Sequence, residues 1–204
     1  NFYINKGNYN HLYKTTYISP FRKIAQISGL YYLVEKDYKK QIQLQEKPSS
    51  WEIIENKIED KLTVFIIGES VRKDFLQIYN PKLSNTPFLE KVNKIQFQNT
   101  ISYGAHTLES LSYAFQAKEN GKPYFPNNII TLANKAGYIT NWISNQGSIG
   151  EYDNHIAAMG NQANYTKFLS KGSYLTAQKD NKLLDVFKER VDSLNKSIYF
   201  LHTI

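Results

Sequence analysis

The sequence predicts an α/β fold in which a mostly parallel sheet is covered by helices on both faces. Two observations predict this class. Strand-like and helix-like patterns alternate along residues 62–204, which is the order of a sheet built from strand–helix–strand units. The run 62–67, LTVFII, is apolar at almost every position, as is typical of strands buried on both faces of a parallel sheet. We therefore expect a three-layer sandwich.

The composition is that of a globular protein with a basic surface. The chain has 204 residues, 41% of them hydrophobic, which suffices for one sizeable core with an appendage. The formal net charge of +7 favours anionic partners such as phospholipid headgroups, lipopolysaccharide or nucleic acid. No nucleic-acid-binding motif accompanies the basic residues, so we expect no nucleic acid among the partners. The absence of cysteine excludes a disulfide framework, a thiolate metal site and a cysteine nucleophile.

The chain has no obvious membrane-spanning or targeting segment. No apolar run approaches the roughly 18 residues of a membrane span, and the N-terminus lacks the apolar stretch of a signal peptide. The first residue is Asn1 rather than methionine. We therefore expect this chain to be a segment of a longer protein.

Residues 1–50 differ in texture from the remainder and are expected to form a separate amphipathic, bridging segment. Ser19 is suited to cap a helix that has Pro20 in its first turn and extends to about residue 40. Its apolar side chains recur at helical spacing, at Phe21, Ile24, Ile27, Leu30, Tyr31 and Val34. This face would either pack against the domain or lie on a membrane surface. Residues 47–50 read as a linker to the second region, 51–204.

The pattern from residue 51 onward predicts the elements of the core in order. In its first half we expect a connection over 51–61, a strand over 62–67, a short helix or turn over 74–79, a helix over 86–92 and a strand over 95–101. In its second half we expect helices over 108–117, 128–136 and 182–194, strands over 138–143 and 197–202, and a loop over 144–147. Gly137 is placed to close the second of these helices.

Two residues suggest a catalytic site. Glu69 follows the first buried strand directly, where open α/β sheets bind ligands. Thr107 ends the small-residue turn 104–107 and precedes a helical pattern. A carboxylate and a presented hydroxyl suit metal binding and nucleophilic attack. Each residue also has an ordinary interpretation, because Glu69 could be an exposed residue after a strand and Thr107 a helix cap.

Four ordered blocks resemble one family, the periplasmic catalytic domain of bacterial phosphoethanolamine transferases in the alkaline phosphatase and sulfatase superfamily. The blocks are residues 66–74 (IIGESVRKD) with Tyr79, 85–89 (NTPFL), 102–110 (SYGAHTLES) and 141–146 (NWISNQ). The resemblance implies an alkaline phosphatase-like three-layer sandwich, present in part. It also implies an enzyme of the bacterial inner membrane whose catalytic domain faces the periplasm.

The resemblance further implies a reaction and a cofactor. Phosphoethanolamine would move from phosphatidylethanolamine to a lipopolysaccharide, lipooligosaccharide or other envelope glycan, through a phosphorylated Thr107. Glu69 and Thr107 would bind Zn²⁺, or another divalent metal. The family's remaining metal ligands, an Asp-His pair, are absent from this chain, so the fragment itself is expected to be inactive. The lack of cysteine fits the lipid A-modifying branch poorly, and the loop 144–146 is more similar to the branch that modifies inner-core sugars.

Further polar residues have weaker claims to function. Arg72 could hold phosphate or merely cover surface, and Asn145 and Gln146, at a strand's C-terminal end, could contact substrate. His106 is adjacent to Thr107, but neighbouring side chains diverge, so a general-base role is not favoured. His202, in an apolar strand, reads as a core histidine whose hydrogen bonds are satisfied.

Two other functions remain open on the sequence. One is a phosphoglycerol transferase or sulfatase-like hydrolase of the same superfamily. The other is an inactive, membrane-associated fragment that binds through its basic, aromatic N-terminal segment.

Overall fold

The computed structural model describes residues 46–57, 62–148, 154–170, 179–191 and 196–204, together with single residues between 29 and 43. The helix predicted over 19–40 therefore lies mostly outside the described residues. Those of its residues that are described, Gly29, Tyr32, Glu35, Lys36 and Lys39, are helical. In the described parts of the chain, no helix is long and apolar enough to cross a membrane.

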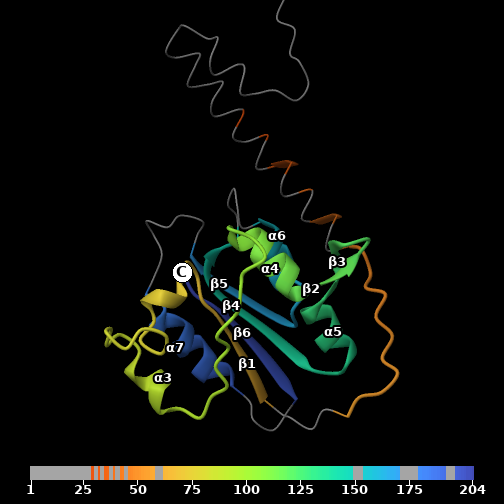
Figure 1. The fold of residues 1–204 in the computed structure, drawn as a ribbon. Coiled ribbons are helices and arrows are strands. Elements are labelled where there is room, and N and C mark those ends of the chain that lie inside the picture. Colours follow the sequence, from red (N-terminus) through yellow and green to blue (C-terminus); the bar gives the residue numbers. More distant parts are fainter. Residues whose placement is uncertain are drawn as a thin grey trace, which may run out of the picture.

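A four-stranded parallel sheet forms the centre of the molecule (Figure 1). Its order is β1-β6-β4-β5, and each pair of neighbours runs in the same direction. The strands are β1 (Leu62–Ile67), β4 (Ile139–Gly147), β5 (Tyr165–Ser170) and β6 (Ser197–His202). The predicted parallel sheet is confirmed, and the carboxyl ends of all four strands lie at one edge of it.

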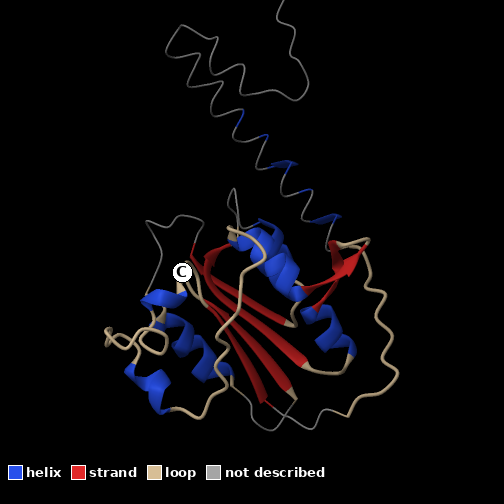
Figure 2. Cartoon of the chain, viewed as in Figure 1, coloured by secondary structure: helices blue, strands red, loops and turns tan. Residues whose placement is uncertain are grey.

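Helices cover the sheet on both faces, as Figure 2 shows by colour. One face carries α4 (Thr107–Phe115), α5 (Ile129–Lys135) and α6 (Asn154–Gly160), and the other carries α7 (Asn181–Arg190). A short 3-10 turn, η1 (Lys73–Phe75), and α3 (Pro87–Lys91) lie between β1 and α4 in sequence. The predicted three-layer α/β class is thereby confirmed.

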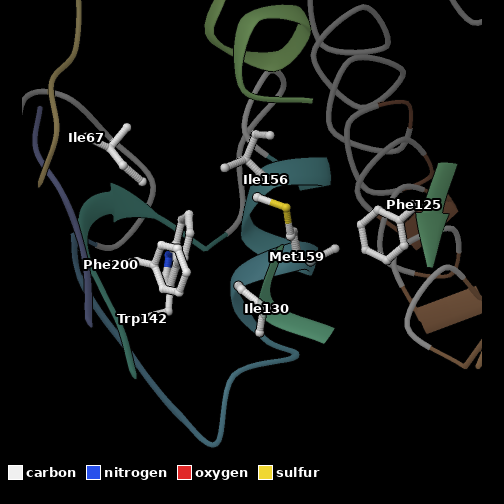
Figure 3. Close-up of a cluster of buried hydrophobic side chains, with 8 residues drawn as sticks. Ile67, Phe125, Ile130, Trp142, Ile156, Met159 and Phe200 are labelled. Carbon is white, nitrogen blue, oxygen red and sulfur yellow. The ribbon is translucent and has the colours of Figure 1, made fainter. Parts of the chain in front are cut away.

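Each face of the sheet has its own hydrophobic core, because side chains alternate between faces along a strand. The larger core packs Trp142 and Phe200 against α5 and α6, with their rings stacked at 5.6 Å between centroids (Figure 3). The smaller core packs Ile143 and Tyr199 against Leu183 of α7. Neighbouring residues of β4 and β6 therefore face opposite sides of the sheet. Trp142 and Phe200 face α5 and α6, whereas Ile143 and Tyr199 face α7.

The run 62–67 is buried on only one face. Leu62 and Val64 are each 38% exposed and Ile66 is 74% exposed, while Phe65 and Ile67 pack into the larger core. The expectation of burial on both faces was therefore wrong for β1. The reason is position, since β1 is an edge strand of the described sheet and the described helices leave its other face uncovered.

Two further element predictions are also wrong. Residues 95–101 form no strand, and Ile95, Phe97 and Ile101 are 86%, 69% and 91% exposed. Although apolar residues alternate here, their side chains do not pack against the core, and the segment pairs with no strand among the described residues. Residues 144–147 form no loop but complete β4, and the Asn145 and Gln146 amides meet protein partners inside the fold. The prediction of a loop was wrong because polar residues, which are typical of loops, occupy the end of this strand.

Several elements were not expected from the sequence. An antiparallel hairpin, β2 (Gln116–Glu119) and β3 (Lys122–Asn128), interrupts the alternation of strands and helices and ends α4 at Phe115. Helix α6 and strand β5 were also missed. The strands predicted over 62–67 and 197–202 have the predicted ends, and the other predicted elements are present with shifted ends. Gly137 has the left-handed backbone (φ 85°) expected after a helix.

Candidate active site

The predicted catalytic pair comes together at the carboxyl edge of the sheet. Glu69 follows β1, and Thr107 is the first residue of α4. The β6 strand, which pairs with β1, ends at His202. Parallel strands deliver the residues after their carboxyl ends to the same edge, which is where open α/β sheets bind ligands.

Glu69 and Thr107 are in direct contact. The Thr107 hydroxyl lies 2.7 Å from Oε1 and 2.8 Å from Oε2 of Glu69, so it donates to the carboxylate between its two oxygens. The Ser70 hydroxyl donates to Oε1 of the same carboxylate at 3.2 Å. The two residues that were predicted to act together therefore form one hydrogen-bonded unit.

The surroundings of Glu69 favour its ionised form. They lower the pKa of its carboxyl group from 4.5 to about 2, chiefly through the His202 ring. The hydroxyl groups of Thr107 and Ser70 lower it further, against partial burial, which raises it. Glu69 is therefore an anion at neutral pH, able to accept hydrogen bonds or to bind a cation.

His202 is buried as expected but faces the site. The residue is 2% exposed, and its Nε2 lies 3.9 Å from Oε2 of Glu69. Its Nδ1 lies 3.4 Å from the Ser144 hydroxyl. The interpretation as a core histidine with satisfied hydrogen bonds was wrong on the second point, because Nε2 has no hydrogen-bond partner among the described residues. Its position at the carboxyl end of a strand was the signal that could have placed it.

The backbone on either side of the site is specialised. Ser70 has a positive φ of 52°, a conformation that non-glycine residues adopt at a cost and that turns the chain sharply after Glu69. Gly104 approaches α4 so closely that a Cβ there would lie 2.7 Å from Oε2 of Glu109 and would meet that residue's own Cβ. Only glycine leaves the turn before Thr107 in this position.

The residues predicted to contact substrate lie in different environments. Arg72 is exposed and pairs with Asp74 through two hydrogen bonds of 3.1 and 2.7 Å. Asn145 is fully buried and donates to Asp180 at 2.8 Å. Gln146 is 4% exposed and donates to the Thr203 carbonyl at 2.9 Å. A substrate role for these three residues stays a prediction. In the fold, the Asn145 amide joins β4 to the residue before α7, and the Gln146 amide joins β4 to the residue after β6.

The donor set suits a divalent cation, in part. The Glu69 carboxylate and the Thr107 hydroxyl lie in contact with each other, and Zn²⁺ accepts both carboxylate oxygen and histidine nitrogen. Over the ranges that the structure describes, there is no cluster of three or more His, Cys, Asp or Glu residues that could hold a metal. Glu69 and Thr107 therefore fit as two ligands of a site that needs others.

Comparison with known proteins places the chain in a family. Phosphoethanolamine transferase OpgE of Escherichia coli K12 is 39% identical over 139 residues, which are 67% of this chain and 26% of OpgE. The chain thus spans about a quarter of that relative's length. The periplasmic domain of EptC from Escherichia coli, solved with Zn, superposes with a TM-score of 0.63 at 22% identity, over 78% of this chain and 47% of that one.

A second solved structure has the same fold over more of the chain. It is the integral membrane protein lipooligosaccharide phosphoethanolamine transferase A (EptA) of Neisseria meningitidis, with a TM-score of 0.55 at 18% identity. The likeness covers 91% of this chain and 35% of EptA. The sulfatase family model matches residues 61–204, well over half of the chain and the whole of the sheet with Glu69 and Thr107, and the chain therefore belongs to the sulfatase family.

Proposed function

We propose that this chain is part of a phosphoethanolamine transferase that modifies a glycan of the bacterial envelope. The observation that carries the proposal is the contact of the Thr107 hydroxyl with both oxygens of Glu69. The similarity to OpgE, and the fold shared with EptC and EptA, support the same reaction class. The donor in this proposal is phosphatidylethanolamine, and the acceptor is a lipopolysaccharide, a lipooligosaccharide or another envelope glycan.

Thr107 is the proposed nucleophile. Its Oγ1 attacks the phosphorus of the donor, forming a new P–O bond while the bond from phosphorus to the glycerol oxygen breaks. Diacylglycerol leaves with the proton that the Thr107 hydroxyl has lost. An acceptor hydroxyl then attacks the same phosphorus, the bond from phosphorus to the Thr107 oxygen breaks, and that oxygen takes up the proton that the acceptor hydroxyl has lost. The two steps leave the enzyme unchanged.

The other residues orient this exchange. Glu69, ionised because its pKa is about 2, holds the Thr107 hydroxyl at the start of α4. Phosphate is favoured there, because the first N–H groups of a helix lack internal partners and carry partial positive charge. Zn²⁺ bound by Glu69 and Thr107 would favour the ionised hydroxyl and offset the negative charge of the phosphate. In this proposal the segment 1–50 contacts the membrane surface that contains the donor, and the exposed Arg72 binds the donor phosphate.

The location follows from the same proposal. A donor that is a membrane phospholipid and an acceptor in the envelope require the site to meet a bilayer. EptA is an integral membrane protein, and the EptC structure is a periplasmic domain. We therefore propose that the intact protein is held in the inner membrane with this domain in the periplasm.

Phosphopeptide mass spectrometry tests the proposal directly. The intact protein is incubated with Zn²⁺ and vesicles of phosphatidylethanolamine, then digested. We expect a phosphoethanolamine adduct on the peptide that contains Thr107, its absence in Thr107→Ala, and its retention in Thr107→Ser, which keeps a hydroxyl. A glycerophosphate adduct from phosphatidylglycerol vesicles would instead assign the phosphoglycerol alternative. A folded, zinc-loaded protein that takes neither adduct would overturn the proposed reaction.

A further inference from the structure

His202 faces Glu69 in the site described above, and its role there, inferred below, rests on the proposed function. His202 ends β6, where its Cα pairs with Ile67 on one side and with Ser144 on the other. The ring is 2% exposed and meets the Trp142 ring edge to face, at 5.8 Å and 66°. Its position is therefore fixed by the sheet and by the larger core rather than by solvent.

The imidazole Nε2 faces the carboxylate of Glu69. This buried atom lies 3.9 Å from Oε2 and has no hydrogen-bond partner in the described parts of the chain. The separation exceeds an ordinary N–H···O hydrogen bond by about 1 Å. A buried N–H group without a partner is costly, so closing this gap is favourable.

The other ring nitrogen, Nδ1, has the Ser144 hydroxyl as its partner, and the direction of that hydrogen bond is coupled to the tautomer of the ring. The backbone N–H of Gln146 donates to the Ser144 hydroxyl at 3.0 Å. The buried Ser144 hydroxyl then has its own hydrogen to place, and Nδ1 of His202 lies 3.4 Å from it. When Nδ1 accepts, the neutral ring carries its proton on Nε2, the nitrogen that faces Glu69.

Three groups thus surround the carboxylate in an ordered way. Ser70 contacts Oε1 alone, His202 faces Oε2 alone, and Thr107 lies between the two oxygens. Without His202, Oε2 would depend on the Thr107 hydroxyl, which also serves Oε1. A ligating carboxylate that is fixed by an outer hydrogen bond binds its metal more tightly, because less freedom is lost on binding.

We propose that His202 is a positioning residue for Glu69. Once the 3.9 Å gap closes, its Nε2–H group donates to Oε2 and orients the carboxylate toward Thr107 and the cation, while the Ser144 hydroxyl, donating to Nδ1, keeps the proton on Nε2. Direct ligation by His202 is the competing arrangement. It requires the opposite tautomer, with the proton on Nδ1 and the Nε2 lone pair on the metal.

Zinc affinity of the intact protein, measured by competition calorimetry with a chelator, tests the proposal without any lipid substrate. We expect His202→Leu to weaken zinc binding about 10- to 100-fold. His202→Gln, whose amide N–H can occupy the place of Nε2–H, should recover most of that loss. Ser144→Ala, which removes the group that selects the tautomer, should give an intermediate loss. Near-ultraviolet circular dichroism reports whether each variant retains its packing.

Each outcome decides for or against the positioning role. Unchanged zinc affinity in a folded His202→Leu, or in Ser144→Ala if the leucine variant does not fold, overturns it. So does X-ray absorption of the zinc-loaded protein that shows one imidazole fewer in His202→Gln than in the wild type, because that would make His202 a ligand. Failure of Thr107 to take any lipid adduct would refute the proposed reaction and leave the zinc measurements intact, so the two failures are distinguishable.

Discussion

The Thr107 hydroxyl lies almost equally far from the two carboxylate oxygens of Glu69, at 2.7 and 2.8 Å. One hydrogen is thereby shared between two acceptors, and the first turn of α4 is tied to the end of β1 across 38 positions of sequence. Because the contact joins two separate elements, it links the ionisation of one side chain to the stability of the fold.

Acid should weaken the metal-free protein through Glu69. The folded state lowers the pKa of this group from 4.5 to about 2, so ionised Glu69 stabilises the fold. That contribution is complete above about pH 4.5 and is lost as the pH falls through about 2. Urea unfolding of the wild type and Glu69→Gln, with chelator, should show a stability difference that shrinks across this window. Parallel pH profiles for the two proteins would contradict the assignment.

Gly104→Ala should impair catalysis through the position of Thr107. A Cβ at residue 104 would press on Glu109 in the first turn of α4 and displace the helix start. We expect a loss of about 10- to 100-fold in the rate of Thr107 labelling, because displacements of about 1 Å have effects of this size. Gly121→Ala, in the hairpin turn between β2 and β3, is the control, since its positive φ of 77° costs stability while labelling stays near wild type.

Gly160→Ala should destabilise the larger core. A Cβ on Gly160 would lie 2.6 Å from Cδ1 and Nε1 of the fully buried Trp142, which is stacked on Phe200 and has little space to move. Overpacking of this kind costs about 1–3 kcal/mol. Chemical denaturation measures it, with Gly68→Ala as control, because a Cβ there makes only an ordinary contact of 3.5 Å with Val71. Equal stability of the two variants would mean that the core relaxes around the added methyl group.

Asn128→Ala should lower the free energy of unfolding by removing the N-terminal cap of α5. The Asn128 side-chain Oδ1 accepts from the N–H groups of Ile130 and Thr131, and the side-chain amide NH₂ donates to the Phe125 carbonyl and to Gln162 Oε1. Alanine removes all of these hydrogen bonds at a fully buried position, which should lower the free energy of unfolding by about 2–4 kcal/mol. Asn128→Ser keeps a capping oxygen without the amide, so its unfolding free energy should fall between the two. A serine variant as unstable as the alanine variant would show that the cap contributes little.

Arg72 and Asn145 should separate in their effects. Arg72→Ala removes an exposed side chain, so the unfolding free energy should change by less than about 0.5 kcal/mol while the KM for the donor rises if Arg72 holds phosphate. Asn145→Ala removes a buried donor to Asp180 and should cost about 1–3 kcal/mol. Thermal melts and initial rates measure both. An unchanged KM in Arg72→Ala would remove that residue from the substrate site.

The sequence predicted that Glu69 and Thr107 would lie together better than it predicted the elements around them. Glu69 and Thr107 could be placed because each follows a local signal, a buried strand or a small-residue turn, and because parallel strands end at one edge. His202 reads as a core histidine in the sequence although it ends a strand, because its orientation toward Glu69 depends on the pairing of β6 with β1 and β4, which no local pattern records. The roles of Ser144 and Ser70 likewise depend on contacts that no local pattern records.

The errors in the fold have physical causes of the same kind. The alternation of Ile95, Phe97 and Ile101 is typical of a strand, but a strand also needs a neighbour to pair with, and sequence periodicity does not supply one. Asn145 and Gln146 look like loop residues until Asp180 and the Thr203 carbonyl are known to receive their amides. Polar residues enter a strand when tertiary partners satisfy them.

The pairing of β1 with β6 also sets an order of events during synthesis. The Thr203 hydroxyl and the Ile67 carbonyl, which hydrogen-bond at the end of this pair, are 136 positions apart. At about 5–20 residues per second, β1 waits roughly 7–30 s after it is made before β6 exists. Glu69 and Thr107 emerge early, but β6, whose His202 faces Glu69, is made much later. In a nascent chain the apolar strand β1 therefore lacks its β6 partner until residues 197–202 have been made and have left the ribosome.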